Sequence, residues 1–286
     1  MKLLNNFWYS YSNILFRSIL KKNYFTFLRK IFGTLFKFSR KCFLHIFSSK
    51  IINLDKINNK KLSKLKLDQL FINFNCDKGS YCFYDGVKIN THKYSVFYEK
   101  YFNKIKKKKL NILELGSHEG RGIASFYYFF PKANFFGANI NPFQMKYSSK
   151  RINELYVDVS SKKILNNLAN YINTDLDLII DDASHNLKDI LLALPIFFKK
   201  LKKNGFYVIE DADQFKVYKE LNPTNEKHTP LKILRNMKNN KKFNSRYLHP
   251  NDVDYLKKNI KKYYFGKGKS IVSGHNISDI IFLKKK

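Results

Sequence analysis

The stretch that decides the fold is residues 112–120, which read Ile-Leu-Glu-Leu-Gly-Ser-His-Glu-Gly. The apolar start predicts a short strand, and a glycine-containing turn follows it directly. Gly116 and Gly120 let the backbone approach a ligand closely, and a helix that begins here offers its free amides to an anionic group such as a carboxylate. Three residues separate the glycines, so the G-x-G-x-x-G spacing of dinucleotide-binding proteins is absent.

Strand and helix patterns alternate along the chain beyond this turn. We predict strands at 111–115, 134–140, 155–159, 176–181 and 205–210, and helices at 120–130, 164–172 and 188–202. Two further strands, 261–265 and 277–283, are expected to pair as an antiparallel hairpin at the far edge of the sheet. The predicted class is therefore α/β, a Rossmann-like doubly wound sheet with its ligand site at the carboxyl ends of the strands.

The N-terminal region differs in composition from the rest of the chain. Residues 1–54 contain no Asp or Glu, and Phe25–Phe36 has the apolar spacing of an amphipathic helix with basic residues on its other faces. We predict a basic helical extension over 1–54, a linker over 55–70 and the catalytic domain over 71–286. The extension suits contact with an anionic membrane surface, packing on the domain or on a second copy in a homo-oligomer, or, less favoured, an organellar transit peptide. Its longest uncharged run is too short to span a bilayer.

Composition limits the classes of function that remain. The net charge of +32 favours a polyanionic partner, but the wealth of Lys, Asn, Ile, Phe and Tyr is also what A/T-rich coding produces. Nucleic acid is the less favoured partner, because no RNA-recognition, helix-turn-helix or zinc-finger pattern is present. The three cysteines, Cys42, Cys76 and Cys82, lack the count and spacing of a disulfide framework or zinc site, so we expect a cytoplasmic protein with reduced thiols, peripheral to the inner membrane face if residues 1–54 bind lipid.

Candidate cofactor residues follow the first three strands. An acidic side chain at the end of the second strand normally accepts hydrogen bonds from an adenosine ribose, and here that position holds Asn139. Asn can still accept one such bond but has no charge. Asp158, after the third strand, is a candidate for contact with an adenine edge or, alternatively, a turn-capping residue. We group Glu114, Ser117 and Asp181 with Gly116 and Gly120 as further cofactor-site candidates.

Two acidic pairs end successive apolar strands. Residues 178–185 read Leu-Ile-Ile-Asp-Asp-Ala-Ser-His, and residues 208–211 read Val-Ile-Glu-Asp. Carboxylates gathered at one sheet edge repel each other unless a cation is present. Asp182, Glu210 and Asp211 are oxygen ligands of the kind that Mg²⁺ prefers, and His185 is placed to take a proton from a substrate hydroxyl. The alternative is that the acids cap a helix and end a strand in solvent.

Several of these motifs together resemble a known family. The run from Asp77 to about Phe215 resembles the metal-dependent sugar O-methyltransferases of the macrolide-tailoring (mycinamicin VI 2''-O-methyltransferase) type and the related cephalosporin-hydroxylase and rhamnosyl O-methyltransferase group. The matching pieces are Asp77–Ser80, His92–Tyr94 with Tyr98 and Phe102, Leu113–Gly116, Ile180–His185 and Tyr207–Asp211. They span about half of the chain. The sequence departs from the family at Asn139, where Asp is usual, and at Ala183, where Gly is common.

The resemblance implies a class I S-adenosylmethionine-dependent methyltransferase. It implies Mg²⁺ or another divalent cation held by Asp182, Glu210 and Asp211, with His185 as general base towards a hydroxyl of a sugar, glycan or glycosylated metabolite. The segment Asp77–Tyr98 would lie beside the cofactor pocket. Two alternatives remain, an RNA methyltransferase and a catalytically degenerate, membrane-associated binding protein with a methyltransferase fold. Asn139 favours the second, whereas the complete acidic and histidine set opposes it.

Overall fold

The computed structural model describes residues 28, 32, 51–57, 59–141 and 144–286. A seven-stranded sheet forms its centre, in the order β10-β13-β9-β8-β4-β5-β7. Its strands are β4 (Asn111–Leu115), β5 (Asn134–Asn139), β7 (Ile152–Tyr156), β8 (Leu176–Asp181), β9 (Leu201–Ile209), β10 (Ile260–Lys267) and β13 (Asp279–Lys285). The first five run parallel, and β13 lies antiparallel between β9 and β10. The predicted α/β class and the C-terminal antiparallel hairpin are confirmed.

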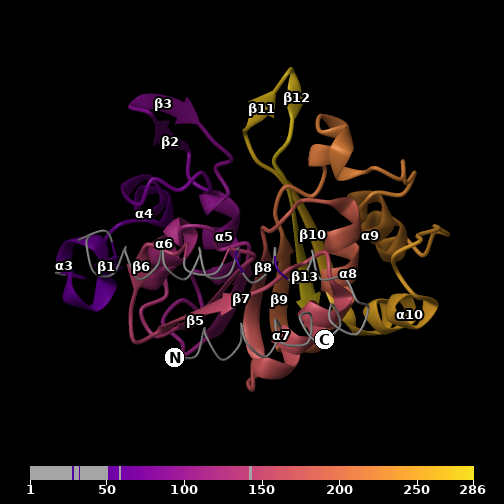
Figure 1. Cartoon of the computed structure of the whole chain (residues 1–286), viewed down its shortest axis with the longest axis horizontal. Coiled ribbons are helices and arrows are strands. Elements are labelled where there is room, and N and C mark those ends of the chain that lie inside the picture. The colour runs from indigo at the N-terminus through magenta and orange to yellow at the C-terminus, as the bar shows by residue number, and fades with distance from the viewer. Residues whose placement is uncertain (1–27, 29–31, 33–50, 58, 142–143) are drawn as a thin grey trace.

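Helices cover both faces of the sheet (Figure 1). One face carries α4 (Leu67–Asn73), α5 (Ser95–Phe102) and α6 (Arg121–Phe129), and the other carries α7 (Lys162–Tyr171), α8 (Leu187–Lys199), α9 (Pro230–Lys238) and α10 (Pro250–Asn259). Side chains alternate between the two faces along each strand, so every strand contributes to the core on both sides of the sheet. Ile112 packs with α6, whereas Leu113 and Leu115 pack on the opposite face. A strand buried on both faces must be apolar almost throughout, which is why β4 and β8 have the bounds predicted from sequence.

Side-chain caps fix where the helices on the second face begin. Ser161 accepts a hydrogen bond from the Ile164 amide at the start of α7, and Asn186 accepts one from the Lys188 amide at the start of α8. Thr229 caps α9 ahead of a proline at its first turn. Such caps each contribute about 1 kcal/mol and satisfy amides that have no partner within the helix.

β7 and β9 differ most from their predicted bounds. β7 starts at Ile152, ahead of the apolar residues that indicated a strand at 155–159, because its first residues pair with β5 at the edge of the sheet and need not be apolar. β9 starts at Leu201, ahead of the predicted strand at 205–210. The register between β8 and β9 shifts between Leu176 and Leu178, and this irregularity accommodates the extra residues.

The region before the sheet contributes to the core. β1 (Ile52–Asn53) pairs with β6 (Tyr147–Ser148), followed by the short helices η1 (Leu54–Lys56) and α3 (Asn59–Leu62). The structure differs here from the predicted linker over 55–70, because Leu67 and Leu70 are buried in α4. Of the predicted extension, Leu28 and Phe32 are helical and exposed. The remainder of residues 1–50 lies outside the described residues, so the extension and its membrane contact stay predictions.

Two small hairpins project at the same end of the molecule (Figure 1). They are β2 (Tyr81–Tyr84) with β3 (Val87–Asn90) and β11 (Ile271–Val272) with β12 (His275–Asn276). Single turns of 3-10 helix, η2 (Gln214–Lys216) and η3 (Lys219–Leu221), follow β9. No helix within the described part of the chain is long and apolar enough to cross a membrane. Cys76 and Cys82 are free thiols.

Candidate functional site

A cleft of about 810 Å³ opens at the carboxyl ends of the parallel strands. Seven of the residues predicted from sequence line it: Glu114, Gly116, Ser117, Asn139, Asp182, His185 and Asp211. Four others, Gly120, Asp158, Asp181 and Glu210, do not line it. The structure therefore brings seven of the predicted residues to one cleft and leaves the other four outside it.

The two glycines of the first turn have different environments. Both have positive φ, +88° at Gly116 and +81° at Gly120. A β-carbon on Gly116 would come within 2.0 Å of the Asp182 carbonyl oxygen, so this glycine lets the ends of β4 and β8 approach each other. A β-carbon on Gly120 would meet the Met145 side chain at 2.6 Å. The close backbone approach expected at these glycines is therefore to other parts of the protein and not to a ligand. Gly120, at the start of α6, allows packing with Met145.

The residues of each acidic pair lie on different faces, because side chains alternate along a strand. Asp181 points away from the cleft into the core on the α8 side. It is 4% exposed, and the Tyr207 hydroxyl donates to its Oδ2 at 2.8 Å. Burial raises the pKa of Asp181 to about 7, despite this hydrogen bond and the nearby His185. The Asp181 carboxyl group thus supports the strand end from behind, and contact of Asp181 with a cofactor stays a prediction.

Glu210 points to the opposite face and meets a buried lysine. The Lys78 ammonium donates to Glu210 Oε2 and also to Asp182 Oδ2, and the Tyr98 hydroxyl donates to Glu210 Oε1 at 2.5 Å. Glu114 Oε1 lies 3.5 Å from the same ammonium. Burial raises the pKa of Glu114 to about 7 and that of Glu210 well above its usual range, although Lys78 opposes both shifts.

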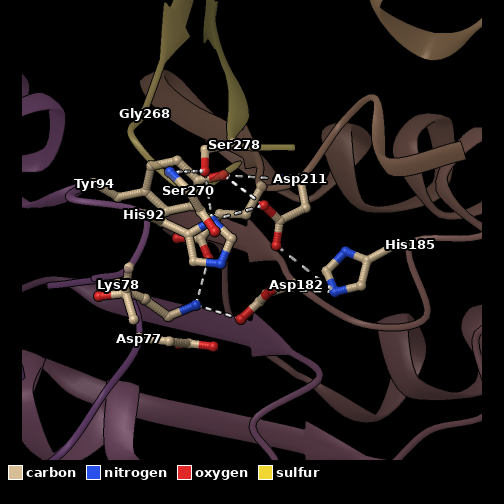
Figure 2. Close-up of polar contacts among 12 residues, drawn as sticks. Asp77, Lys78, His92, Tyr94, Asp182, His185, Asp211, Gly268, Ser270 and Ser278 are labelled. Carbon is tan, nitrogen blue, oxygen red and sulfur yellow. Dashed lines mark hydrogen bonds and ion pairs between the residues drawn. The ribbon is translucent and has the colours of Figure 1, made fainter. Parts of the chain in front are cut away.

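Figure 2 shows Asp211 in a second polar group, together with His92, Tyr94 and Ser278. His92 Nδ1 is 3.2 Å from Asp211 Oδ1 and 2.8 Å from Ser278 Oγ, and the Tyr94 hydroxyl donates to Asp211 Oδ1 at 2.6 Å. Burial alone would lower the pKa of His92, but Asp211 raises it to about 9. Burial would likewise raise the pKa of Asp211, and the bond from His92 holds it below its usual value.

Asp182, His185 and Asp211 converge where these two groups meet. One potential ligand atom from each lies within 4.8 Å of the others, with His185 Nε2 3.7 Å from Asp182 Oδ1 and 4.0 Å from Asp211 Oδ2. His185 and Asp211 both adopt positive φ, 53° and 52°. Non-glycine residues held in this region store strain, which is typical of functional sites. Asp182 and Asp211 are the candidate cation ligands, His185 stands beside them, and Glu210 lies outside the trio behind Lys78.

The remainder of the cleft is the candidate cofactor region. Ser117 is 4% exposed, and its hydroxyl has no hydrogen-bond partner among the described residues. Asn139 Nδ2 donates to the His118 and Asn141 carbonyls, each at 3.4 Å, and to Gln144 Oε1 at 3.1 Å. This shell of acceptors suits an amide better than the carboxylate usual at this position.

Asp158 lies apart from that region. Its Oδ1 accepts hydrogen bonds from the Ser160 amide at 3.0 Å and hydroxyl at 2.6 Å, so the carboxylate closes its own turn. The strand before it ends at Tyr156, three residues earlier than the sequence indicated. The turn-capping alternative describes its observed contacts, and contact with adenine stays a prediction.

Four residues of the site received no separate role from the sequence: Lys78, His92, Tyr94 and Tyr98. Backbone hydrogen bonds bring the first three together, since the His92 and Tyr94 amides donate to the Asp77 and Lys78 carbonyls. All four residues belong to the sequence motifs quoted above for the family resemblance. Those motifs were the signal that could have identified them as site residues. Their partners lie more than 100 positions away in sequence, so no local pattern could assign them.

Comparison with solved structures shows the fold of class I S-adenosylmethionine-dependent methyltransferases. MycE methyltransferase from the mycinamycin biosynthetic pathway, in complex with Mg, SAH and mycinamycin VI, matches with a TM-score of 0.57 and 20% identity, over 78% of this chain and 55% of that chain. A further structure of MycE with Mg and SAH gives a TM-score of 0.56 and 19% identity, with the same coverage.

A curated sequence relative is of the same type. The 8-demethyl-8-alpha-L-rhamnosyl tetracenomycin-C 2'-O-methyltransferase of Streptomyces olivaceus is 25% identical over 131 residues, which is 43% of this chain and 34% of the relative. No protein-family model matches the chain. The match spans about a third of the curated relative and about half of MycE. The predicted resemblance to sugar O-methyltransferases of this type is confirmed.

Proposed function

We propose that this chain transfers a methyl group from S-adenosylmethionine to a hydroxyl group of a glycosylated small molecule, with the help of a divalent cation. The observation that carries the proposal is the convergence of Asp182, His185 and Asp211 in a cleft that continues to Ser117 and Asn139. A base, anionic ligands and a cofactor wall in one cleft are the components that such a transfer needs.

S-Adenosylmethionine, the methyl donor, fits the cleft wall formed by the β4–α6 turn and the end of β5. The buried Ser117 hydroxyl lacks a partner among the residues described, which leaves it available to a ligand. In its bonds within the protein, the Asn139 amide donates through nitrogen, so its oxygen can accept a bond from a ribose hydroxyl. S-Adenosylmethionine bound here would supply an electrophilic methyl group on a positively charged sulfur.

The divalent cation fits between Asp182 and Asp211, the two carboxylates that converge with His185. Asp182 and Asp211 offer hard oxygen atoms, which Mg²⁺ prefers, and the ligand atoms of the trio lie close to one another. A divalent cation held there would act as a Lewis acid and lower the pKa of the acceptor hydroxyl. The Asp182–Glu210–Asp211 ligand set remains part of this proposal, with Glu210 becoming available if Lys78 releases it.

His185 provides the acid–base function in the proposed reaction. The acceptor oxygen attacks the methyl carbon, the new C–O bond forms as the C–S bond breaks, and the hydroxyl proton passes to His185 Nε2. Asp182 and Asp211, at 3.7 and 4.0 Å, stabilise the resulting imidazolium. General-base catalysis of this kind is worth roughly 10² to 10⁴ in rate.

A sugar hydroxyl is proposed as the acceptor, because the names of the relatives describe a rhamnosyl 2'-O-methyltransferase and a methyltransferase bound to mycinamycin VI. Membrane contact, nucleic-acid binding and oligomerisation stay predictions from the sequence.

The test is calorimetric titration of S-adenosylmethionine into the full chain, with Mg²⁺ and with chelator, followed by mass spectrometry of glycosylated acceptors. We expect micromolar donor binding and cation-dependent methylation that Asp182→Asn abolishes. Asp252→Asn removes a carboxylate from the surface pair with Lys199, far from the cleft, and serves as the control. Absence of donor binding under all conditions would refute the proposal.

A further inference from the structure

Lys78 is buried within a group of three carboxylates, and Figure 2 shows its ammonium beside one of them, Asp182. Its side chain is 4% exposed, and its ammonium contacts Asp182 and Glu210 directly, with Glu114 further away at 3.5 Å. These four side chains come from the loop after α4 and from the ends of β8, β9 and β4. Water is excluded from most of them, so each charge depends on its neighbours for compensation.

One carboxylate oxygen of this group is left over. Glu114 Oε2 is buried and has no hydrogen-bond partner within the described ranges. A buried acceptor without a partner destabilises the folded state, so it indicates a partner that arrives in another state of the protein. One ammonium faces three carboxyl groups, so the group can take up further positive charge, such as that of a divalent cation, as its acids ionise.

We infer that Lys78 is an exchangeable internal cation, which moves its ammonium from Asp182 and Glu210 to Glu114 when a divalent cation binds at Asp182. The inference rests on the proposed cation site and assigns positioning roles to Lys78 and Glu114. Lys78 keeps the ligand carboxylates together before the cation arrives, and Glu114 then receives the displaced ammonium.

The local packing permits this exchange. Lysine has a flexible four-carbon stem, and the ammonium needs to travel only a short distance, since Glu114 Oε1 is already 3.5 Å away. Gly122 of α6 leaves the space open, because a β-carbon there would lie 2.7 Å from Glu114 Oε1 and 3.0 Å from Lys78 Cε. This glycine is helical with negative φ, so its lack of a side chain serves packing rather than an unusual backbone conformation.

The exchange makes cation affinity depend on two residues that do not contact the cation. Replacing Lys78 removes the competing ammonium and strengthens cation binding. Replacing Glu114 removes the alternative partner of that ammonium and weakens cation binding. The two effects are coupled, because Glu114 matters only while Lys78 must be displaced. A lysine that merely fastens the fold would produce neither this pair of opposite signs nor the coupling.

The experiment is titration of Mn²⁺ into the full chain without donor or acceptor, followed by calorimetry. We expect Lys78→Met to tighten Mn²⁺ binding about tenfold and Glu114→Gln to weaken it about tenfold, within the range of typical coupling between sites. In the Lys78→Met background, Glu114→Gln should change the affinity less than about twofold. Lys146→Met, which removes a half-exposed lysine paired with Glu119 at the cleft, controls for general loss of positive charge.

Near-ultraviolet circular dichroism checks that each variant is folded. Glu114→Gln is nearly isosteric and tests the inference by itself if Lys78→Met fails to fold. Weaker or unchanged Mn²⁺ binding in folded Lys78→Met overturns the inference, as does unchanged binding in Glu114→Gln or absence of binding in both wild type and Lys78→Met. Titration of S-adenosylhomocysteine in chelator separates this failure from failure of the proposed methyl transfer.

Discussion

His92 and Asp211 form a buried ion pair in which Nδ1 lies 3.2 Å from Oδ1, leaving Asp211 Oδ2 on the side of His185. The Ser278 hydroxyl, 2.8 Å from the same nitrogen, ties the pair to the C-terminal part of the sheet. The pair therefore connects the segment before the sheet, the end of β9 and the start of β13 at one point of the candidate site.

This ion pair should make stability depend on pH. The pKa of His92 is raised in the folded state from 6.5 to about 9, so its contribution is fully present below about pH 6.5 and is lost as pH rises through 9. We expect His92→Gln to lower the free energy of unfolding by an amount of the order of 3 kcal/mol near pH 6, and by much less near pH 10. Urea unfolding across this range measures the difference.

The matched control for this prediction is His275→Gln in the exposed β11–β12 hairpin, which should change stability little at any pH. A pH-independent loss in His92→Gln would mean that packing and the Ser278 contact, rather than charge, account for the role of His92.

Gly116 and Gly86 form a second comparison. Both have positive φ, +88° and +81°, so alanine is strained at either position by about 1 kcal/mol. At Gly116 alanine would also collide with the Asp182 carbonyl, whereas at Gly86 no described atom lies within 4 Å. We expect Gly116→Ala to destabilise the protein by at least about 2 kcal/mol more than Gly86→Ala, measured by thermal unfolding. Equal effects would contradict the proposed contact between the strand ends.

The proposed roles of His185 and Asp182 can be separated. A general base is needed for turnover but not for holding a cation, so His185→Ala should lower kcat by roughly 10² to 10⁴ while Mn²⁺ affinity stays within about twofold. Asp182→Asn should weaken Mn²⁺ binding as well as turnover. If His185→Ala abolishes Mn²⁺ binding, the imidazole is a ligand and the proton acceptor must be another group.

The substitution Asn139→Asp tests whether the surroundings of this side chain are adapted to an amide. A carboxylate at this position would face the oxygens of His118, Asn141 and Gln144, which now accept from Nδ2. We expect Asn139→Asp to lower stability by about 1 kcal/mol and to bind S-adenosylhomocysteine no more tightly than the wild type, although it introduces the acid usual in the methyltransferases that the sequence resembles. Tighter binding without loss of stability would show that the acceptor shell rearranges freely. Asn141→Asp, at an exposed neighbouring position, is the control for added charge.

Local pattern was sufficient for the fold and for the edge that carries the site. The bounds of β4 and β8 were predicted correctly, because strands buried on both faces need continuous apolar runs. The acids that follow β8 and β9 were expected at a common edge, since parallel strands end together. β7 was displaced from its predicted bounds because an edge strand has a weaker apolar pattern.

The sequence by itself thus determined the α/β class, and it predicted a site at the carboxyl edge with Asp182, His185 and Asp211, which the structure brings together. Only the tertiary structure decided that Asp181 and Glu210 turn into opposite layers of the core and that Lys78 stands among the acids. The physical reason is that side-chain direction depends on where each strand ends and on its register with its neighbours. The partner of a buried charge, such as Lys78 for Asp182 at a separation of 104 residues, is chosen by the packing of the whole chain.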